Sequence, residues 1–565
     1  MNDKNIFDAL RDIDEQWILD AAPGKRRSAA SVWAKWGTLA ACLCLVVASV
    51  LAIVLWSRSS NGSSPSHTHV FGEWTVIKEA SCSERGEQMR VCVCGEKEIQ
   101  LIALLPHFAG EWVIEKEPTI KMPTPDDPTQ REPGLKCQFC DRCGAKLGEE
   151  LIPATGSLGL AYAINPDGKT FAVAGIGNCT DENIVVPENF CGYHVTSVMQ
   201  GAFRGCTGVK SITLPQTVTV IGEYAFADSW FQSVTLPKEL LKIGEYAFSD
   251  SNLISISIPP KAEIGRRAFE NCDALRKVVV KEGIKQIPNY AFLGCLLLKT
   301  VELPEGLESI GESAFRDCTQ LVDIILPKTV TKIGKDAFSH CSSLKSIVLP
   351  AGLHTVEEGL FSWCHRLESV TVSYGIQKIQ AEAFAECYKL KSIVIPDSVT
   401  EMAWSIFQNC SALERVVLPK GLKTISRDMF SGCDALQELI IPDSVTSIGE
   451  NAFDFCDMLV EIEDGIGYVG SWAVDYDRYI ADVVVRDGTV GLIDKLFYEY
   501  GRVVRVTLPN SIKYIGKRSF AENSNLKGIV FKGTEEEWEA IQKGEYWDEY
   551  SKWYSVFFEP EQSPT

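Results

Sequence analysis

The chain has 565 residues, enough for several domains, and its 45% of hydrophobic residues is ordinary for folded protein. A formal net charge of −20 argues against nucleic-acid binding, which needs a basic surface. The sequence contains no G-x-S-x-G motif, no P-loop and no H-E-x-x-H motif. These observations predict a protein that is not an enzyme.

The first 36 residues are polar and are predicted to form a cytoplasmic tail. Within them, Ile6, Leu10, Ile13 and Trp17 fall at helical spacing. We expect a short surface helix there. A docking segment for a cytoplasmic or membrane-surface partner is the alternative.

Residues 37–56 form an uncharged apolar run, which predicts a single transmembrane helix. Twenty residues at about 1.5 Å each span roughly 30 Å, the thickness of one bilayer core. Lys25, Arg26, Arg27 and Lys35 precede the run, so the positive-inside rule predicts a cytoplasmic N-terminus and an extracellular remainder. Residues 39–42 also resemble a lipoprotein box, but the apolar run continues well beyond Cys42. This length favours a retained anchor over lipidation or cleavage.

A polar linker, residues 57–66, leads into a duplicated Cys/His module at residues 67–156. Each copy offers one histidine and three cysteines, which could fill the tetrahedral shell of a structural zinc ion. The first set is His69, Cys82, Cys92 and Cys94, and the second is His107, Cys137, Cys140 and Cys143. Disulfides, or thiols without a metal, remain the alternatives. A catalytic zinc is disfavoured because no neighbouring general-base motif accompanies the set.

A strict repeat dominates the rest of the chain. Cysteine recurs every 23 residues from Cys272 to Cys456, and phenylalanine stands three residues before each one. Such a period predicts a solenoid, in which each unit buries its apolar face against its neighbours. We assign the solenoid to residues 202–530, an N-terminal cap to residues 157–201, and a C-terminal cap and tail to residues 531–565.

One unit predicts two short strands and a turn. In residues 344–350, Ile347 and Leu349 are expected to point inward, whereas Ser346 and Val348 face outward. A second strand is expected around residues 330–333, before Gly334. The following Ala-Phe pair is predicted to lie on a helical or 3₁₀ turn. The repeated cysteines are interpreted as buried packing residues, since stacked side chains run parallel and do not converge as a disulfide requires.

The L-x-S-I-x-L-P and I-G-x-x-A-F-x-x-C blocks, from about Val195 to Val530, resemble the BspA-type leucine-rich repeat proteins. The resemblance implies a β-rich (α+β), right-handed leucine-rich-repeat solenoid with a curved face. It also implies a surface or secreted role in adhesion or partner binding, without catalysis. The Cys/His region is similar to small modules that accompany these repeats in other bacterial surface proteins, which implies a spacer or recognition role.

One outward strand position is almost wholly β-branched and apolar over six consecutive units. We call this row the outward stripe: Ile325, Val348, Thr371, Val394, Val417 and Ile440. Exposed apolar patches of this extent mark interaction sites, although the row can also be explained as good strand-forming chemistry. The sequence thus predicts a membrane-anchored extracellular protein that binds a protein or glycan through its repeats. A metal-dependent regulator or sensor, using the Cys/His module and the cytoplasmic tail, is the alternative.

Overall fold

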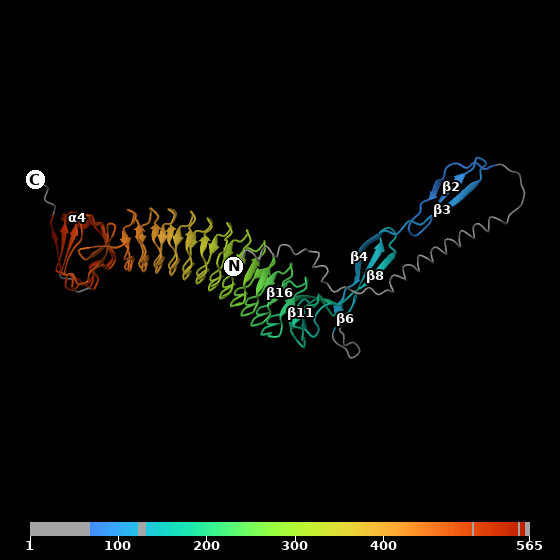
Figure 1. Ribbon diagram of the computed structural model, residues 1–565, viewed down its shortest axis with the longest axis horizontal. Coiled ribbons are helices and arrows are strands. Elements are labelled where there is room, and N and C mark those ends of the chain that lie inside the picture. The colour runs from blue at the N-terminus through green and yellow to red at the C-terminus, as the bar shows by residue number, and fades with distance from the viewer. Residues whose placement is uncertain (1–67, 122–130, 500–501, 552–553, 560–565) are drawn as a thin grey trace, which may run out of the picture. The chain divides into compact units, whose positions relative to one another are not determined.

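The computed structural model describes residues 68–121, 131–499, 502–551 and 554–559 (Figure 1). The chain divides into two compact units, residues 1–107 and 108–565, each described by itself below. The predicted tail (1–36), membrane span (37–56) and linker (57–66) lie outside the described residues. Among the residues that are described, no helix is long and apolar enough to cross a membrane.

The described part of the first unit is a three-stranded antiparallel sheet in the order β1-β2-β3. Its strands are β1 (Thr75–Lys78), β2 (Gly86–Val91) and β3 (Lys97–Ile102). The second unit begins with a similar antiparallel sheet in the order β4-β7-β8. This sheet contains β4 (Ala109–Lys116), β7 (Gly134–Cys140) and β8 (Lys146–Ile152). The two copies of the Cys/His module predicted from the sequence therefore each contain a three-stranded antiparallel sheet.

Two short strands of the predicted Cys/His module instead join the solenoid. β5 (Thr119–Ile120) pairs in parallel with β12 (Asn189–Phe190) and antiparallel with β6 (Arg131–Glu132). Ile120 is buried in the solenoid core. The Arg131 guanidinium donates hydrogen bonds to the carbonyls of Ala154 and Gly156 at 2.6 and 2.9 Å. The solenoid sheet thus begins before the boundary at residue 157 that the sequence suggested.

A hairpin covers the N-terminal end of the solenoid. β9 (Ala161–Ile164) and β10 (Phe171–Gly175) pair antiparallel, and β10 pairs in parallel with the first repeat-type strand, β13 (Tyr193–Val198). Asp167 closes the hairpin turn, since its carboxylate accepts hydrogen bonds from the amides of Lys169 and Thr170 at 2.8 and 2.9 Å. This hairpin lies within residues 157–201, the range assigned to the N-terminal cap.

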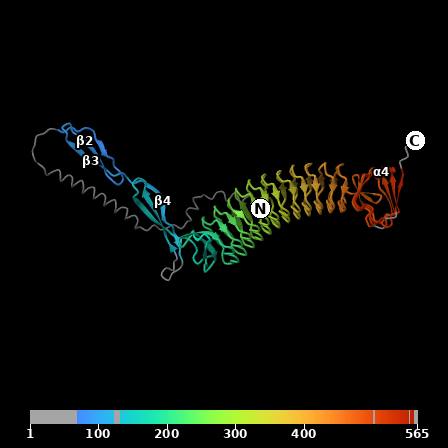
Figure 2. The same ribbon diagram turned by 180° about the vertical axis from the view of Figure 1, so that it is seen from behind.

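The repeats form a β-solenoid of stacked coils, and both views show each coil beside the coils before and after it (Figures 1 and 2). Most coils carry a first and a second strand, and where equivalent strands of neighbouring coils pair, they do so in parallel and in register. The first strands are β11 (Asn183–Val185), β14 (Ser211–Thr213), β16 (Ser233–Thr235), β18 (Ser255–Ile258), β20 (Lys277–Val280), β22 (Thr300–Glu302), β25 (Ser346–Val348), β27 (Ser369–Thr371), β29 (Ser392–Val394), β31 (Arg415–Val417), β33 (Glu438–Leu439), β38 (Asp482–Val484), β40 (Arg505–Pro509), β42 (Gly528–Lys532) and β44 (Ser555–Phe558).

The second strands are shorter, usually two residues long. After β13 they are β15 (Val220–Ile221), β17 (Lys242–Ile243), β19 (Glu263–Ile264), β21 (Gln286–Ile287), β23 (Ser309–Ile310), β24 (Lys332–Ile333), β26 (Thr355–Val356), β28 (Lys378–Ile379), β30 (Glu401–Met402), β32 (Thr424–Ile425), β34 (Ser447–Ile448), β39 (Gly491–Leu492), β41 (Tyr514–Ile515) and β43 (Gln542–Lys543). The predicted pair of strands per unit is confirmed.

The Ala-Phe pair lies on two consecutive turns, so the predicted helical turn is wrong. Ala337 donates a hydrogen bond to the carbonyl of Gly334, and Cys341 donates to that of Phe338, at 3.3 and 3.2 Å. The third residue of each turn, Asp336 or His340, has a positive φ of 55° or 60°. This is the pattern of a type II turn. The Phe338 amide then donates to the carbonyl of Leu360 in the next coil, which stacks the turns into a further ladder.

Besides the aliphatic side chains of the strands, two ladders of side chains run through the solenoid core. The phenylalanine rings stack coil upon coil, with centroids of Phe315 and Phe338 5.6 Å apart and their planes 5° from parallel. The repeated cysteines are buried, and each thiol donates to the phenylalanine carbonyl of the preceding coil, as Cys341 does to Phe315 at 3.2 Å. Burial raises the pKa of the Cys341 thiol well above its ordinary value, so the thiol keeps the proton it donates. None of the described cysteines forms a disulfide.

The irregular stretch after Phe453 is an antiparallel insertion. β35 (Glu461–Glu463), β36 (Ile466–Val469) and β37 (Trp472–Tyr476) form a meander, and β37 then pairs in parallel with β39. The C-terminal cap contains α4 (Glu535–Ala540), the only helix among the described residues. Thr534 and Glu537 form a capping box at its start, and Trp538 is buried against the solenoid core. This helix lies within residues 531–565, the range assigned to the C-terminal cap and tail.

Candidate binding face and metal centre

The outward stripe lies on the exposed side of the first strands. Ile347 is 3% exposed and Val348, the next residue, is 62% exposed, as the alternation in a strand requires. Val348 pairs in register with Thr371, and Val394 pairs with Val417. Side chains of the stripe therefore repeat at about 4.8 Å from one coil to the next.

The ends of the stripe are its most exposed members. Ile325 and Ile440 are 82% and 86% exposed, and each lies just outside a regular strand. Thr371 is also exposed. A row of exposed serines, Ser346, Ser369 and Ser392, runs beside the stripe two residues earlier in each coil. An apolar row with a polar edge of this kind is suited to burial against a partner.

His69, Cys92 and Cys94 converge in the first unit. Their ligand atoms all lie within 4.8 Å of one another, and His69 Nδ1 is 3.1 Å from Cys94 Sγ. Hydrogen bonds from the backbone and the thiol of Cys94, joined by one from His69, lower the pKa of Cys92 to about 7. A lowered pKa favours the thiolate, which is the form that binds metal ions. Such a set of two sulfurs and one imidazole suits a transition metal such as zinc.

The remaining predicted ligands are grouped differently from the two sets of four. In the first unit, Cys82 is buried and its ligand atom lies within 4.8 Å of that of His107, outside the His69 cluster. In the second unit, Cys140 and Cys143 lie within 4.8 Å of one another. Cys137 is not among the described residues that gather as possible metal ligands. Its buried thiol instead donates to Glu115 Oε2 at 3.1 Å, and burial raises its pKa.

A glycine pattern near the end of the solenoid does not form a nucleotide site. Residues 465–470 have the spacing G-x-G-x-x-G, which in dinucleotide-binding proteins lies between a strand and a helix. Here it spans the antiparallel strand β36, which continues into β37. The helix N-terminus that would hold a pyrophosphate is therefore missing at this position.

Comparisons with known proteins agree with this architecture. The family model of the BspA type leucine rich repeat region matches in six copies, over residues 177–299, 285–414, 377–488 and 458–543. A comparison with curated proteins finds no match.

Several solved structures are similar to the chain. One is a leucine-rich repeat protein from Bacteroides ovatus, with 24% identity and a TM-score of 0.39, covering 70% of this chain and 98% of that one. A leucine rich cell surface protein from Faecalibacterium prausnitzii has 20% identity and a TM-score of 0.33, covering 69% and 97%. The pneumococcal vaccine antigen PcpA has 19% identity and a TM-score of 0.32, covering 68% and 88%.

The family matches run without a gap from residue 177 to residue 543, which is more than half of the chain. They coincide with the coils, turns and core ladders described above. The protein belongs to the BspA-type leucine-rich repeat family.

Proposed function

We propose that this protein is a membrane-anchored extracellular recognition or adhesion protein that binds a protein or glycan along the outward stripe and performs no catalysis. The observation that carries the proposal is the exposure of the stripe. Val348 and Val394 are each 62% exposed in a parallel row, although burial of such side chains is worth about 1.5–3 kcal/mol each. A partner that covers the row would gain this burial.

The binding face can be tested by charge substitution at matched positions. Val348→Asp/Val417→Asp places two charges in the stripe. The control Thr213→Asp/Thr235→Asp places the same charges at the same exposed strand position in earlier coils. Each full-length variant is measured in detergent against a panel of purified extracellular-matrix proteins and a glycan array. We expect the stripe variant to lose at least about tenfold in affinity for the ligand that the wild type binds. Equal binding by both variants, with the fold intact, would overturn the proposal.

The anchoring part of the proposal rests on the apolar sequence at residues 37–56. Membrane fractions of cells expressing the full chain are compared with those of cells expressing a chain that lacks these residues. We expect the full chain to stay with the membranes after washing with alkaline carbonate and the shortened chain to be released. An unchanged distribution would contradict an anchor in this segment.

We further propose that His69, Cys92 and Cys94 hold one structural metal ion, with zinc as the first candidate. The convergence of the three ligand atoms supports this proposal. The test measures metal content in the full-length chain purified without added metal. His69→Ala/Cys94→Ala should contain about one zinc ion less per chain than wild type, whereas the control His194→Ala should be unchanged. Equal zinc in all three proteins, or a Cys92–Cys94 disulfide in the wild type, would exclude this site.

A further inference from the structure

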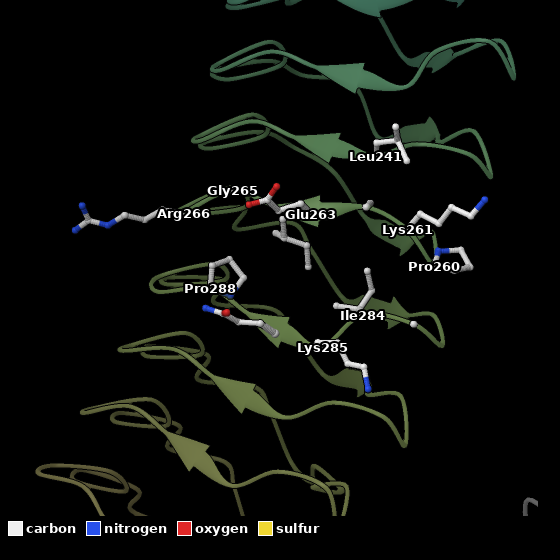
Figure 3. A pocket seen from close by; sticks show the side chains of 13 residues that line it. Leu241, Pro260, Lys261, Glu263, Gly265, Arg266, Ile284, Lys285 and Pro288 are labelled. Atoms are coloured by element: carbon white, nitrogen blue, oxygen red, sulfur yellow. The ribbon is translucent and has the colours of Figure 1, made fainter.

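The ladder of second strands is interrupted between β19 and β21, as it also is between β24 and β26 and between β30 and β32. The first of these interruptions carries a groove. β19 is the last strand of one sheet and β21 the first strand of the next, whereas the first strands β18, β20 and β22 pair continuously across the same coils. The turns also stay connected, since Phe269 donates to the carbonyl of Ala291 at 2.9 Å. In Figure 3 the strand carrying Glu263 and the next second strand lie visibly farther apart than their neighbours do. The opening is therefore confined to the second strands.

Pro288 explains why the ladder opens here. It stands at the unit position that Gly265 and Gly311 occupy in the neighbouring coils. The Gly265 amide donates to the carbonyl of Ile243 at 2.8 Å, but a proline has no N–H to donate to Ile264. A Cβ atom at Gly265 would come within 2.5 Å of the backbone of Gly244. A proline ring at the same position is thus too large for the usual coil spacing.

The opening forms a groove of about 950 Å³, a size typical of ligand sites. Backbone groups line both of its edges. In the next coil, Glu308 and Ser309 donate to the carbonyl of Lys285 at 2.8 and 3.2 Å. The corresponding amides of Lys285 and Gln286 make no such bond to the preceding coil in the described structure. The groove thus presents backbone N–H donors of the β21 coil along one edge and backbone carbonyl acceptors of the β19 coil along the other.

Cations outnumber anions in the groove lining. Lys261, Lys285 and Arg266 contribute three positive charges, against one negative charge from Glu263. This local excess contrasts with the net charge of −20 for the chain. Lys261 and Lys285 form exposed ion pairs with Glu239 and Glu308 at 2.5 and 3.0 Å. Exposed pairs of this kind are weak, so a ligand carboxylate can replace the glutamate.

We propose that this groove binds an acidic peptide segment in extended conformation, which adds as a strand between β19 and β21. Main-chain hydrogen bonds would give the affinity, as in other cases of β-strand addition. The cations would select acidic side chains. The groove lies on other coils and on other strands than the outward stripe, so this inference goes beyond the function proposed above.

The test uses the full-length chain and three labelled peptides, followed by fluorescence anisotropy. The first peptide alternates glutamate and valine, the second alternates lysine and valine, and the third replaces every other valine of the first with proline. We expect the first to bind, with an affinity that falls as salt rises. The lysine peptide should fail because its charge is reversed, and the proline peptide because it lacks backbone donors.

Two variants distinguish peptide binding in the groove from attraction of the peptide to the general surface charge. Pro288→Gly restores the missing N–H and the usual residue, so the ladder should close and peptide binding should weaken at least about tenfold while the fold is kept. Lys261→Glu/Lys285→Glu should weaken binding similarly. The control Lys420→Glu/Lys423→Glu makes the same charge change in a distant coil and should have no effect. Full affinity in both groove variants, equal binding of all three peptides, or binding of a polyuronate glycan but of no peptide would each overturn the proposal.

Discussion

The thiol of Cys341 shows how one residue type serves nine consecutive coils of this solenoid, from Cys272 to Cys456. It is fully buried, and it gives the Phe315 carbonyl a second hydrogen bond besides the one from the Cys318 amide. Ser551 takes the same position in the last coil and donates to the carbonyl of Phe520 at 2.5 Å. A small side chain with one hydrogen to donate is therefore what the position requires.

Cys341→Ala should lower the free energy of unfolding by about 1–2 kcal/mol, because it removes one buried hydrogen bond between neighbouring coils and leaves a small void. Cys341→Ser should cost less, since a hydroxyl can make the same bond. The measurement is equilibrium unfolding of the full chain in urea, with Ser346→Ala on the exposed strand face as the control. Equal stabilities of Cys341→Ala and wild type would contradict this role.

Much of the residue-level pattern could be predicted from the sequence. The inward position of Ile347, the outward position of Val348 and the packing role of Cys341 follow from periods of 2 and 23, and the structure confirms all three. The left-handed residues could not be predicted in this way. Asp336, His340 and Trp363 all have positive φ. Asp and His are enriched in that conformation but Trp is not, so residue type alone does not identify these positions.

At the level of elements, the stacked turns explain why a helical turn was the wrong prediction. A left-handed L-residue is unfavourable by itself, by about 1–2 kcal/mol in a helix. Here each such residue also donates its amide to the next coil, as His340 does to the carbonyl of Ser362 at 2.8 Å. The ladder between coils therefore overrides local preference, and a sequence read one unit at a time does not contain that contact.

Gly334→Ala tests how closely these elements pack. An added Cβ would lie 2.5 Å from the backbone nitrogen of Glu312 in the preceding coil, so one coil would have to shift. We expect a loss of about 1–3 kcal/mol in unfolding free energy. Gly421→Ala is the matched control, because nothing lies within 4 Å of its added Cβ. The same thermal and urea unfolding for both variants would show that the coils adjust without penalty.

The grouping of the candidate metal ligands and the groove at Pro288 could not be predicted from the sequence. Residue types and spacing predicted that histidines and cysteines would gather, but not that Cys82 would lie apart from His69. That outcome depends on how β2 and β3 pair, which spacing does not determine. Pro288 was visible in the sequence, but its consequence needed the register of neighbouring coils.

At the scale of the whole molecule, an open solenoid must cover its ends, because a terminal coil presents unpaired strands and apolar side chains. At the C-terminal end, β44 pairs with β42 and β43 pairs with β41. Trp538 of α4 packs against Phe531, with ring centroids 5.5 Å apart. These contacts keep the last regular coil from solvent.

A chain that ends at Lys532 should therefore self-associate, because it exposes the β42 edge together with Ile529 and Phe531, both fully buried in the intact protein. Light scattering after size-exclusion chromatography, in the same detergent as the full chain, measures the change in mass. Thr534→Ala is the control: it removes the capping hydrogen bond, which costs about 1 kcal/mol, but leaves both strands covered. The control should keep the mass of the full chain. If the shortened chain instead had the same number of protomers as the full-length protein, the prediction would be wrong. The cap would then stabilise the last coil without protecting its edge.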